Sequence, residues 1–186
     1  MEQNHHPAIL HTKNWINNVV IGLNLCPFAA KPFKDDLINY QVEPEANLNI
    51  ALQALIRQCI KMDSDAGIET SFIIFPNNFT NFFDYLDLVD LGEKLIVKEG
   101  YEGIYQIASF HPLYQFAETN PDDPENYTNR SPYPILHILR EESLEIILSK
   151  FSNSSQIPEK NIETTRKLGL AYMKELWKSS FEPPLL

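Results

Sequence analysis

The sequence predicts an α/β (or α+β) protein with a small three- to four-stranded, mostly parallel or mixed sheet covered by about five helices. Segments with helical and strand periodicity alternate along the chain. One strand segment is short and continuously apolar, which is typical of a strand covered on both faces. Successive strand–helix–strand units favour parallel pairing through right-handed crossovers, although a mixed sheet with an extra short strand also fits.

Two helices and a strand are expected in the first third of the chain. Apolar residues recur with helical spacing over about residues 8–25, and Pro27 ends this predicted helix. Residues 37–43 alternate between apolar and polar, which predicts an edge strand with one wet face. A second amphipathic helix begins near Asn47 and ends before the turn at Gly67.

The middle of the chain predicts two more strands around a helix. Residues 70–75 form the continuous apolar run of a covered strand. Residues 82–98 have an inward apolar stripe and precede Gly100, as expected of a helix and its terminator. Residues 104–110 predict the third strand.

A long loop and two helices complete the expected order. The loop runs from Pro112 to about Ser131, and its length of about 19 residues exceeds the roughly 12–15 beyond which loops are often functional. Helices are predicted over about residues 133–151 and 158–178, with Ser131 as the cap of the first.

The chain predicts a single domain over residues 1–186, with a core over about 8–178 and two tails. The N-terminal tail is polar and the C-terminal tail is rich in proline. No internal repeat or linker divides the sequence. A chain of 186 residues is long enough to bury about 70% of its unfolded surface.

Charge and cysteine content limit the classes of function. The net charge of −10 argues against nucleic acid and anionic membranes as partners, because phosphate binding needs a basic face. No apolar stretch approaches the roughly 18 residues of a membrane span, and the first residues lack a secretory signal pattern. Two cysteines are too few for a disulfide framework. We therefore expect a cytoplasmic protein with reduced thiols.

Two histidines and a glutamate are the candidate catalytic or metal-ligating residues. His111 follows the third strand, at the end where open α/β sheets bind ligands, although it also fits a hydrogen-bonding cap. His137 and Glu141 are four residues apart and share the inward face of the predicted helix. The pair has two interpretations. In the first, both residues are ligands of a divalent metal, with His111 or a loop aspartate as a third ligand. In the second, the carboxylate orients the imidazole for acid/base catalysis.

Two arginines and a tyrosine are the candidate substrate-binding residues. Arg130 and Arg140 flank the predicted helix start, where unpaired N–H groups and guanidinium forks would favour a small anion. Alternatively, Arg130 pairs with the acidic residues of the loop and pins it. Tyr114 predicts part of an aromatic pocket wall, or packing of the loop against the body.

The cysteines allow a weaker hypothesis. The thiol of Cys26 would be less reactive at the C-terminal end of one helix, because the helix dipole raises its pKa there. It would be more reactive if Cys26 caps a new helix starting at Pro27. A small buried side chain is the favoured interpretation of Cys26, and Cys59 is expected in the core. No glycine-rich motif that could cradle phosphate is present.

Five phrases carry a family resemblance: residues 22–29 (GLNLCPFA), 110–112 (FHP) with Tyr114 and Phe116, 129–134 (NRSPYP), 139–141 (LRE) preceded by His137, and 157–159 (IPE) followed by Asn161. On these phrases the chain resembles, over about residues 8–178, the bacterial family catalogued as domain of unknown function fourteen-fifteen. The resemblance implies a bacterial cytosolic protein. It brings no established activity.

Three hypotheses for function follow. The preferred one is an enzyme in which His111, His137 and Glu141 are metal ligands or proton-transfer groups and Arg130 and Arg140 hold a small anionic substrate. The second is a non-catalytic module that binds a small anion or a partner's carboxylate. In the third, the polar cluster is a buried network that fixes the loop, and function lies on an interaction surface. The first requires both imidazoles to face one shared hollow.

Overall fold

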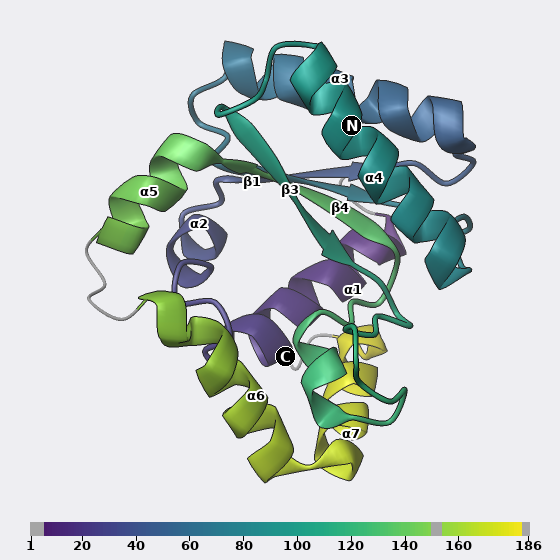
Figure 1. Cartoon of the computed structure of the whole chain (residues 1–186), viewed down its shortest axis with the longest axis vertical. Helices are drawn as coiled ribbons and strands as arrows, with labels where there is room; N and C mark the ends of the chain where they lie inside the picture. The colour runs from purple at the N-terminus through teal and green to yellow at the C-terminus, as the bar shows by residue number, and fades with distance from the viewer. Residues whose placement is uncertain (1–5, 150–153, 184–186) are drawn as a thin grey trace.

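A four-stranded mixed sheet lies between two layers of helices in the computed structural model, which describes residues 6–149 and 154–183 (Figure 1). The strand order is β1-β2-β4-β3, with β1 parallel to β2 and the other two pairs antiparallel. The α/β class with a mixed sheet is thus confirmed. The strands are β1 (Ile38–Val42), β2 (Thr70–Ile74), β3 (Tyr105–Phe110) and β4 (Ile135–Arg140).

The helices agree with the sequence periodicity over most of the chain. Asparagine side chains begin two of them: Asn47 caps α3 and Asn81 caps α4 through backbone N–H groups of the first turn. The α-helices within the described residues are α1 (Pro7–Trp15), α2 (Ala30–Lys34), α3 (Leu48–Ser64), α4 (Phe82–Lys98), α5 (Glu141–Ser149), α6 (Ile157–Leu168) and α7 (Leu170–Lys178).

Helices α3 and α4 cover one face of the sheet (Figure 1). Their buried side chains include Leu55 and Leu88, which belong to one cluster with Leu136 and Ile138 of β4. Gly92 allows α4 to approach closely, because a Cβ there would lie 3.1 Å from a methyl carbon of Ile107.

Helix α1 covers the other face and continues as a π-helical turn over Ile16–Ile21. Trp15 and Val19 pack there with Phe72 and Ile135 of the central strands. The core therefore consists of two clusters separated by the sheet.

The prediction of a helix over residues 133–151 is wrong at residues 133–140. Residues Ile135–Arg140 form β4, between β2 and β3, and α5 begins only at Glu141. The apolar side chains of β4 are covered on both faces; Ile135 and Ile138 are each 0% exposed. A short, mostly apolar segment has no period that distinguishes a covered strand from a buried helix. The end of the predicted helix, at residues 150–151, lies outside the described residues.

Other boundaries differ in smaller ways. The predicted helix over 158–178 is divided into α6 and α7 by Gly169, whose φ of 80° lies in the left-handed region. The edge position of β1 is confirmed, whereas β3 pairs antiparallel with β4 instead of continuing a parallel sheet. Residues 1–5 and 184–186 of the predicted tails lie outside the described residues. None of the helices in the described ranges has both the length and the apolar character needed to cross a membrane.

Candidate functional site

The two histidines proposed to meet lie on opposite faces of the sheet. The ring of fully buried His111 lies 5.2 Å from that of Phe82, on the α4 side. The ring of His137 stacks on Phe72 at 4.0 Å, on the α1 side. The predicted shared hollow is therefore not formed. Within residues 6–149 and 154–183, no three histidine, cysteine or carboxylate side chains are grouped so that they could hold a metal ion.

His111 has protein partners on both ring nitrogens. Nε2 lies 2.8 Å from the carbonyl oxygen of Phe79, to which it donates, and Nδ1 accepts from the backbone N–H of Leu113 at 3.0 Å. This arrangement requires a neutral ring, and burial lowers its pKa. The contacts match the alternative in which His111 is a hydrogen-bonding cap after β3.

Arg130 is committed to the loop. Its Nε donates to the carbonyl of Tyr114 at 3.1 Å and its Nη2 to that of Pro121 at 2.7 Å. The guanidinium also lies 4.6 Å from the centre of the Tyr127 ring. Arg130 thus pins the loop as the alternative expected, but through backbone carbonyls rather than acidic side chains.

Arg140, at the end of β4, holds the connection between α3 and β2. Its Nε donates to the carbonyl of Ile68 at 3.1 Å, and its Nη2 donates to that of Met62 at 2.5 Å. Nη1 donates to the Tyr105 hydroxyl at 3.2 Å. Each guanidinium nitrogen therefore has a protein acceptor, which leaves little capacity for a bound anion.

The remaining predicted site residues lie away from His137. Glu141 begins α5, where its backbone N–H donates to the carbonyl of Ile104. Its side chain lines a shallow hollow beside α4 together with Glu93. Because β4 replaces the predicted helix, Glu141 and His137 share no helical face. The ring of Tyr114 packs against that of Phe82, at 5.3 Å, and so helps to seat the loop.

The buried side-chain amide of Asn126 forms hydrogen bonds that hold the long loop together. The Oδ1 atom of Asn126 accepts from the backbone N–H of Phe116 at 3.0 Å and from the Thr119 hydroxyl at 2.9 Å. Its Nδ2 donates to the carbonyl of Asn120 at 2.8 Å. The short helical turn Pro124–Thr128 carries this amide. These contacts fit the hypothesis of a polar network that fixes the loop.

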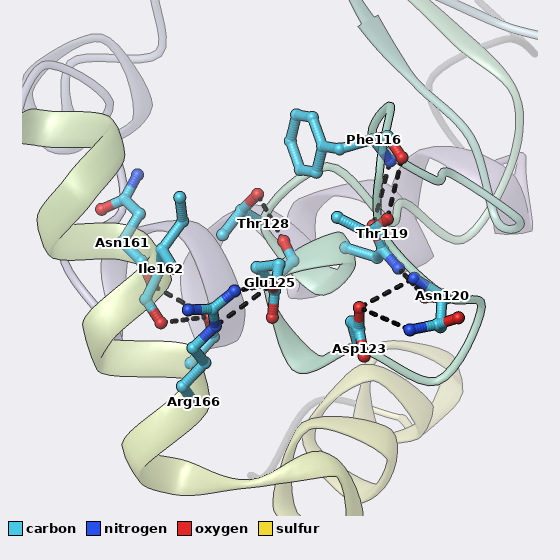
Figure 2. Close-up of polar contacts among 11 residues, drawn as sticks. Phe116, Thr119, Asn120, Asp123, Glu125, Thr128, Asn161, Ile162 and Arg166 are labelled. Atoms are coloured by element: carbon cyan, nitrogen blue, oxygen red, sulfur yellow. Dashed lines mark hydrogen bonds and ion pairs between the residues drawn. The ribbon is translucent and has the colours of Figure 1, made fainter.

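An ion pair ties the same loop to α6 (Figure 2). Glu125 is only 3% exposed, and its Oε1 accepts from Nε of Arg166 at 3.1 Å and from Nη2 at 2.5 Å. The guanidinium holds the pKa of the Glu125 carboxyl below its ordinary value. Figure 2 shows both hydrogen bonds reaching from the helix to the loop.

A cavity of about 220 Å³ lies on the α1 side of the sheet. Its floor is the sheet itself, and α1, the segment before α2 and the first turns of α5 form its walls. The sheet residues of the lining are Ile38, Thr70, Phe72, Ala108, Phe110, His137, Leu139 and Arg140. Most of the lining is carbon, which is the usual character of a small-molecule site.

His137 is one of the polar residues that line this cavity. Its Nε2 lies 2.5 Å from the hydroxyl of Thr70, which donates its single proton to the carbonyl of Ile138 at 2.6 Å. The imidazole must therefore be the donor at Nε2, because the hydroxyl has no second proton and the carbonyl can only accept. In this neutral tautomer Nδ1 is an acceptor, and among the described residues it has no hydrogen-bond partner.

Burial keeps the His137 ring uncharged. Removal from water lowers its pKa from 6.5 to about 3. The stacked Phe72 ring offers no charge to offset this loss of hydration.

Cys26 also lines the cavity. Backbone N–H groups of Phe28 and Ala29 donate to its sulfur, but burial outweighs them and raises the pKa of the thiol. The thiol is consequently neutral, which does not favour the nucleophile hypothesis. Cys59 is fully buried, as predicted.

Thr70, Ala108 and Phe110 were not among the predicted site residues. Each belongs to a strand and faces the same side of the sheet as His137, as the pairing of Phe72 and Ala108 with His137 shows. Recognition of residues 135–140 as a strand would have placed these side chains together by alternation.

Fold and cavity together define a three-layer α/β protein with a mixed sheet and an apolar cavity whose lining includes one neutral histidine. The model of the family described as "Protein of unknown function (DUF1415)" matches residues 7–175. The chain therefore belongs to this family, as its sequence phrases predicted. Comparison with curated proteins and with solved structures found no match.

Proposed function

We propose that the protein binds a small, mainly apolar molecule in the cavity between α1 and the sheet. The observation that carries this proposal is the cavity volume of about 220 Å³ within an almost entirely carbon lining. An engineered apolar cavity of about 150 Å³ holds benzene, so this one has room for roughly nine non-hydrogen atoms. Burial of that much apolar surface is a sufficient driving force for measurable binding.

The contacts favour binding over the enzyme hypothesis of a His/Glu/Arg site. An acid/base catalyst works best when its pKa is near the working pH, whereas the pKa of His137 is about 3. His137 and Glu141 line different hollows and so do not form a common metal site. The guanidinium groups of Arg130 and Arg140 donate to protein oxygen atoms, so binding of a small anion by these residues is also less favoured.

A cavity-filling substitution tests the proposal. Ala108→Leu adds three carbons opposite His137, while Gln106→Leu adds a leucine on the same strand outside the lining. We expect saturable binding of toluene to the wild type and to Gln106→Leu, measured by ligand-observed NMR. Binding to Ala108→Leu should be at least tenfold weaker.

Folding of each variant is checked by circular dichroism, and Ala29→Leu provides a second way to fill the cavity. Absence of saturable binding of toluene and of phenol to the wild type would overturn the proposal. Equal binding by the filled and unfilled cavities would do the same, because the ligand would then sit elsewhere.

A further inference from the structure

We propose that the ligand of this cavity is a neutral aromatic molecule that donates one hydrogen bond, from a hydroxyl or N–H group, to Nδ1 of His137. This inference rests on the proposed function and adds the chemical class of the ligand to it.

The donor character follows from the proton positions around His137. The Thr70 hydroxyl donates a hydrogen bond to the carbonyl of Ile138, at 2.6 Å, and so fixes the imidazole proton on Nε2. Nδ1 is left with a lone pair and no protein donor among the described residues. A ligand satisfies this atom only with an O–H or N–H group, whereas a carbonyl or carboxylate oxygen would place two acceptors against each other.

The aromatic character follows from the rings of the lining. Trp15, Phe28, Phe72 and Phe110 all line the cavity beside His137. They come from α1, from the segment before α2 and from two strands, so rings surround the site from several directions. The Phe110 ring lies 6.0 Å from that of His137 and 5.1 Å from that of Trp15. Flat rings gain stacking and edge contacts in such a lining beyond simple burial.

The neutral charge follows from the ionisable groups that line the cavity. Arg140 donates from Nε, Nη1 and Nη2 to protein oxygen atoms and has no free fork for a carboxylate. Glu69 lines the cavity as well, and its negative charge opposes an anion. A charged ligand would also lose its hydration in a lining of carbon atoms.

A comparison of two probes in two proteins tests this inference. Phenol and toluene have nearly the same shape, but only phenol donates a hydrogen bond. His137→Phe keeps a flat ring beside Phe72 and removes the acceptor. We expect the ratio of the toluene Kd to the phenol Kd to fall by about tenfold from wild type to His137→Phe. The affinity for toluene should change little.

Thr70→Val provides a second variant, because it removes the hydroxyl that fixes the proton on Nε2 and keeps the side-chain shape. The phenol preference should fall in this variant too, while toluene still binds. An unchanged ratio in both variants would overturn the inference and leave the proposed function standing. Tighter binding of benzoate or benzylamine than of phenol would overturn it as well. Binding of none of the four probes would remove the proposed function itself.

Discussion

Acidification is expected to destabilise the protein through His137, and the size of the effect follows from its pKa. The pKa is about 3 in the folded chain and 6.5 in an ordinary environment. Between these values the unfolded chain binds a proton that the folded chain does not, so the free energy of unfolding falls as the pH drops below 6.5. Above pH 6.5 the ring is neutral in both states and contributes no pH dependence.

At pH 5, which is about 1.5 units below the ordinary pKa, the free energy of unfolding should be lower by about 2 kcal/mol. Each pH unit between the ordinary and the folded pKa contributes about 1.36 kcal/mol. His137→Phe cannot take up this proton. Between pH 7 and pH 5 its free energy of unfolding should therefore fall by about 2 kcal/mol less than that of the wild type.

Urea unfolding at pH 7, 6 and 5 measures the difference directly. His111 and His11, whose pKa values are also lowered by burial, are present in both proteins and cancel in the comparison. Parallel stability curves for the two proteins over this range would refute the burial of a neutral imidazole at position 137.

Three further changes probe the loop and the C-terminal helices. Asn126→Ala leaves buried donors and acceptors of the loop unpaired and should lower the free energy of urea unfolding by about 3 kcal/mol, whereas Asn120→Ala should change it by less than about 0.5. Glu125→Gln should flatten the loss of stability below about pH 4.5, since Arg166 lowers the pKa of this carboxyl and its contribution disappears as the pH falls through the folded value. Gly169→Ala places a Cβ at a φ of 80° and should lower the melting temperature, at a cost of about 1–2 kcal/mol.

Each of these changes has an outcome that contradicts its reasoning. Equal effects at positions 126 and 120 would mean that the buried amide does not organise the loop. If Glu125→Gln leaves the loss of stability below about pH 4.5 unchanged, the ion pair with Arg166 does not contribute to stability at low pH. An unchanged melting temperature for Gly169→Ala would show that the break between α6 and α7 needs no glycine.

Much of the fold could be predicted because its signals are local. Four segments each carry a local signal for one element: the alternation over residues 37–43, the helical spacing that begins near Asn47, the apolar run of residues 70–75 and the apolar stripe over residues 82–98. These elements form β1, α3, α4 and β2 close to their predicted positions.

The position of His137 could not be predicted in the same way. Apart from His137 and Arg140, residues 135–140 are apolar, because β4 is covered by a helix layer on each side. Their assignment depends on β2 and β3, which lie far away in the sequence. A helix over β4 would place His137 and Glu141 on one face. The residues that His137 contacts in the sheet, Thr70 and Phe72, cannot be found from that assignment.

The roles of the polar residues were also set by distant backbone atoms. Arg140 donates to carbonyls of the end of α3 and of the α3–β2 connection, and His111 donates to the carbonyl of Phe79. Sequence gives the residue types but no means to tell which distant carbonyls they will satisfy. A cavity is still harder to foresee, because it depends on how closely whole layers approach one another.

The imidazole ¹⁵N spectrum of His137 at pH 7, assigned by its loss in His137→Phe, tests the central claim most directly. We predict a neutral ring with the proton on Nε2, and a change in the Nδ1 signal when phenol is added but not when toluene is added. A proton on Nδ1, a charged ring, or a spectrum that phenol leaves unaltered would contradict the account.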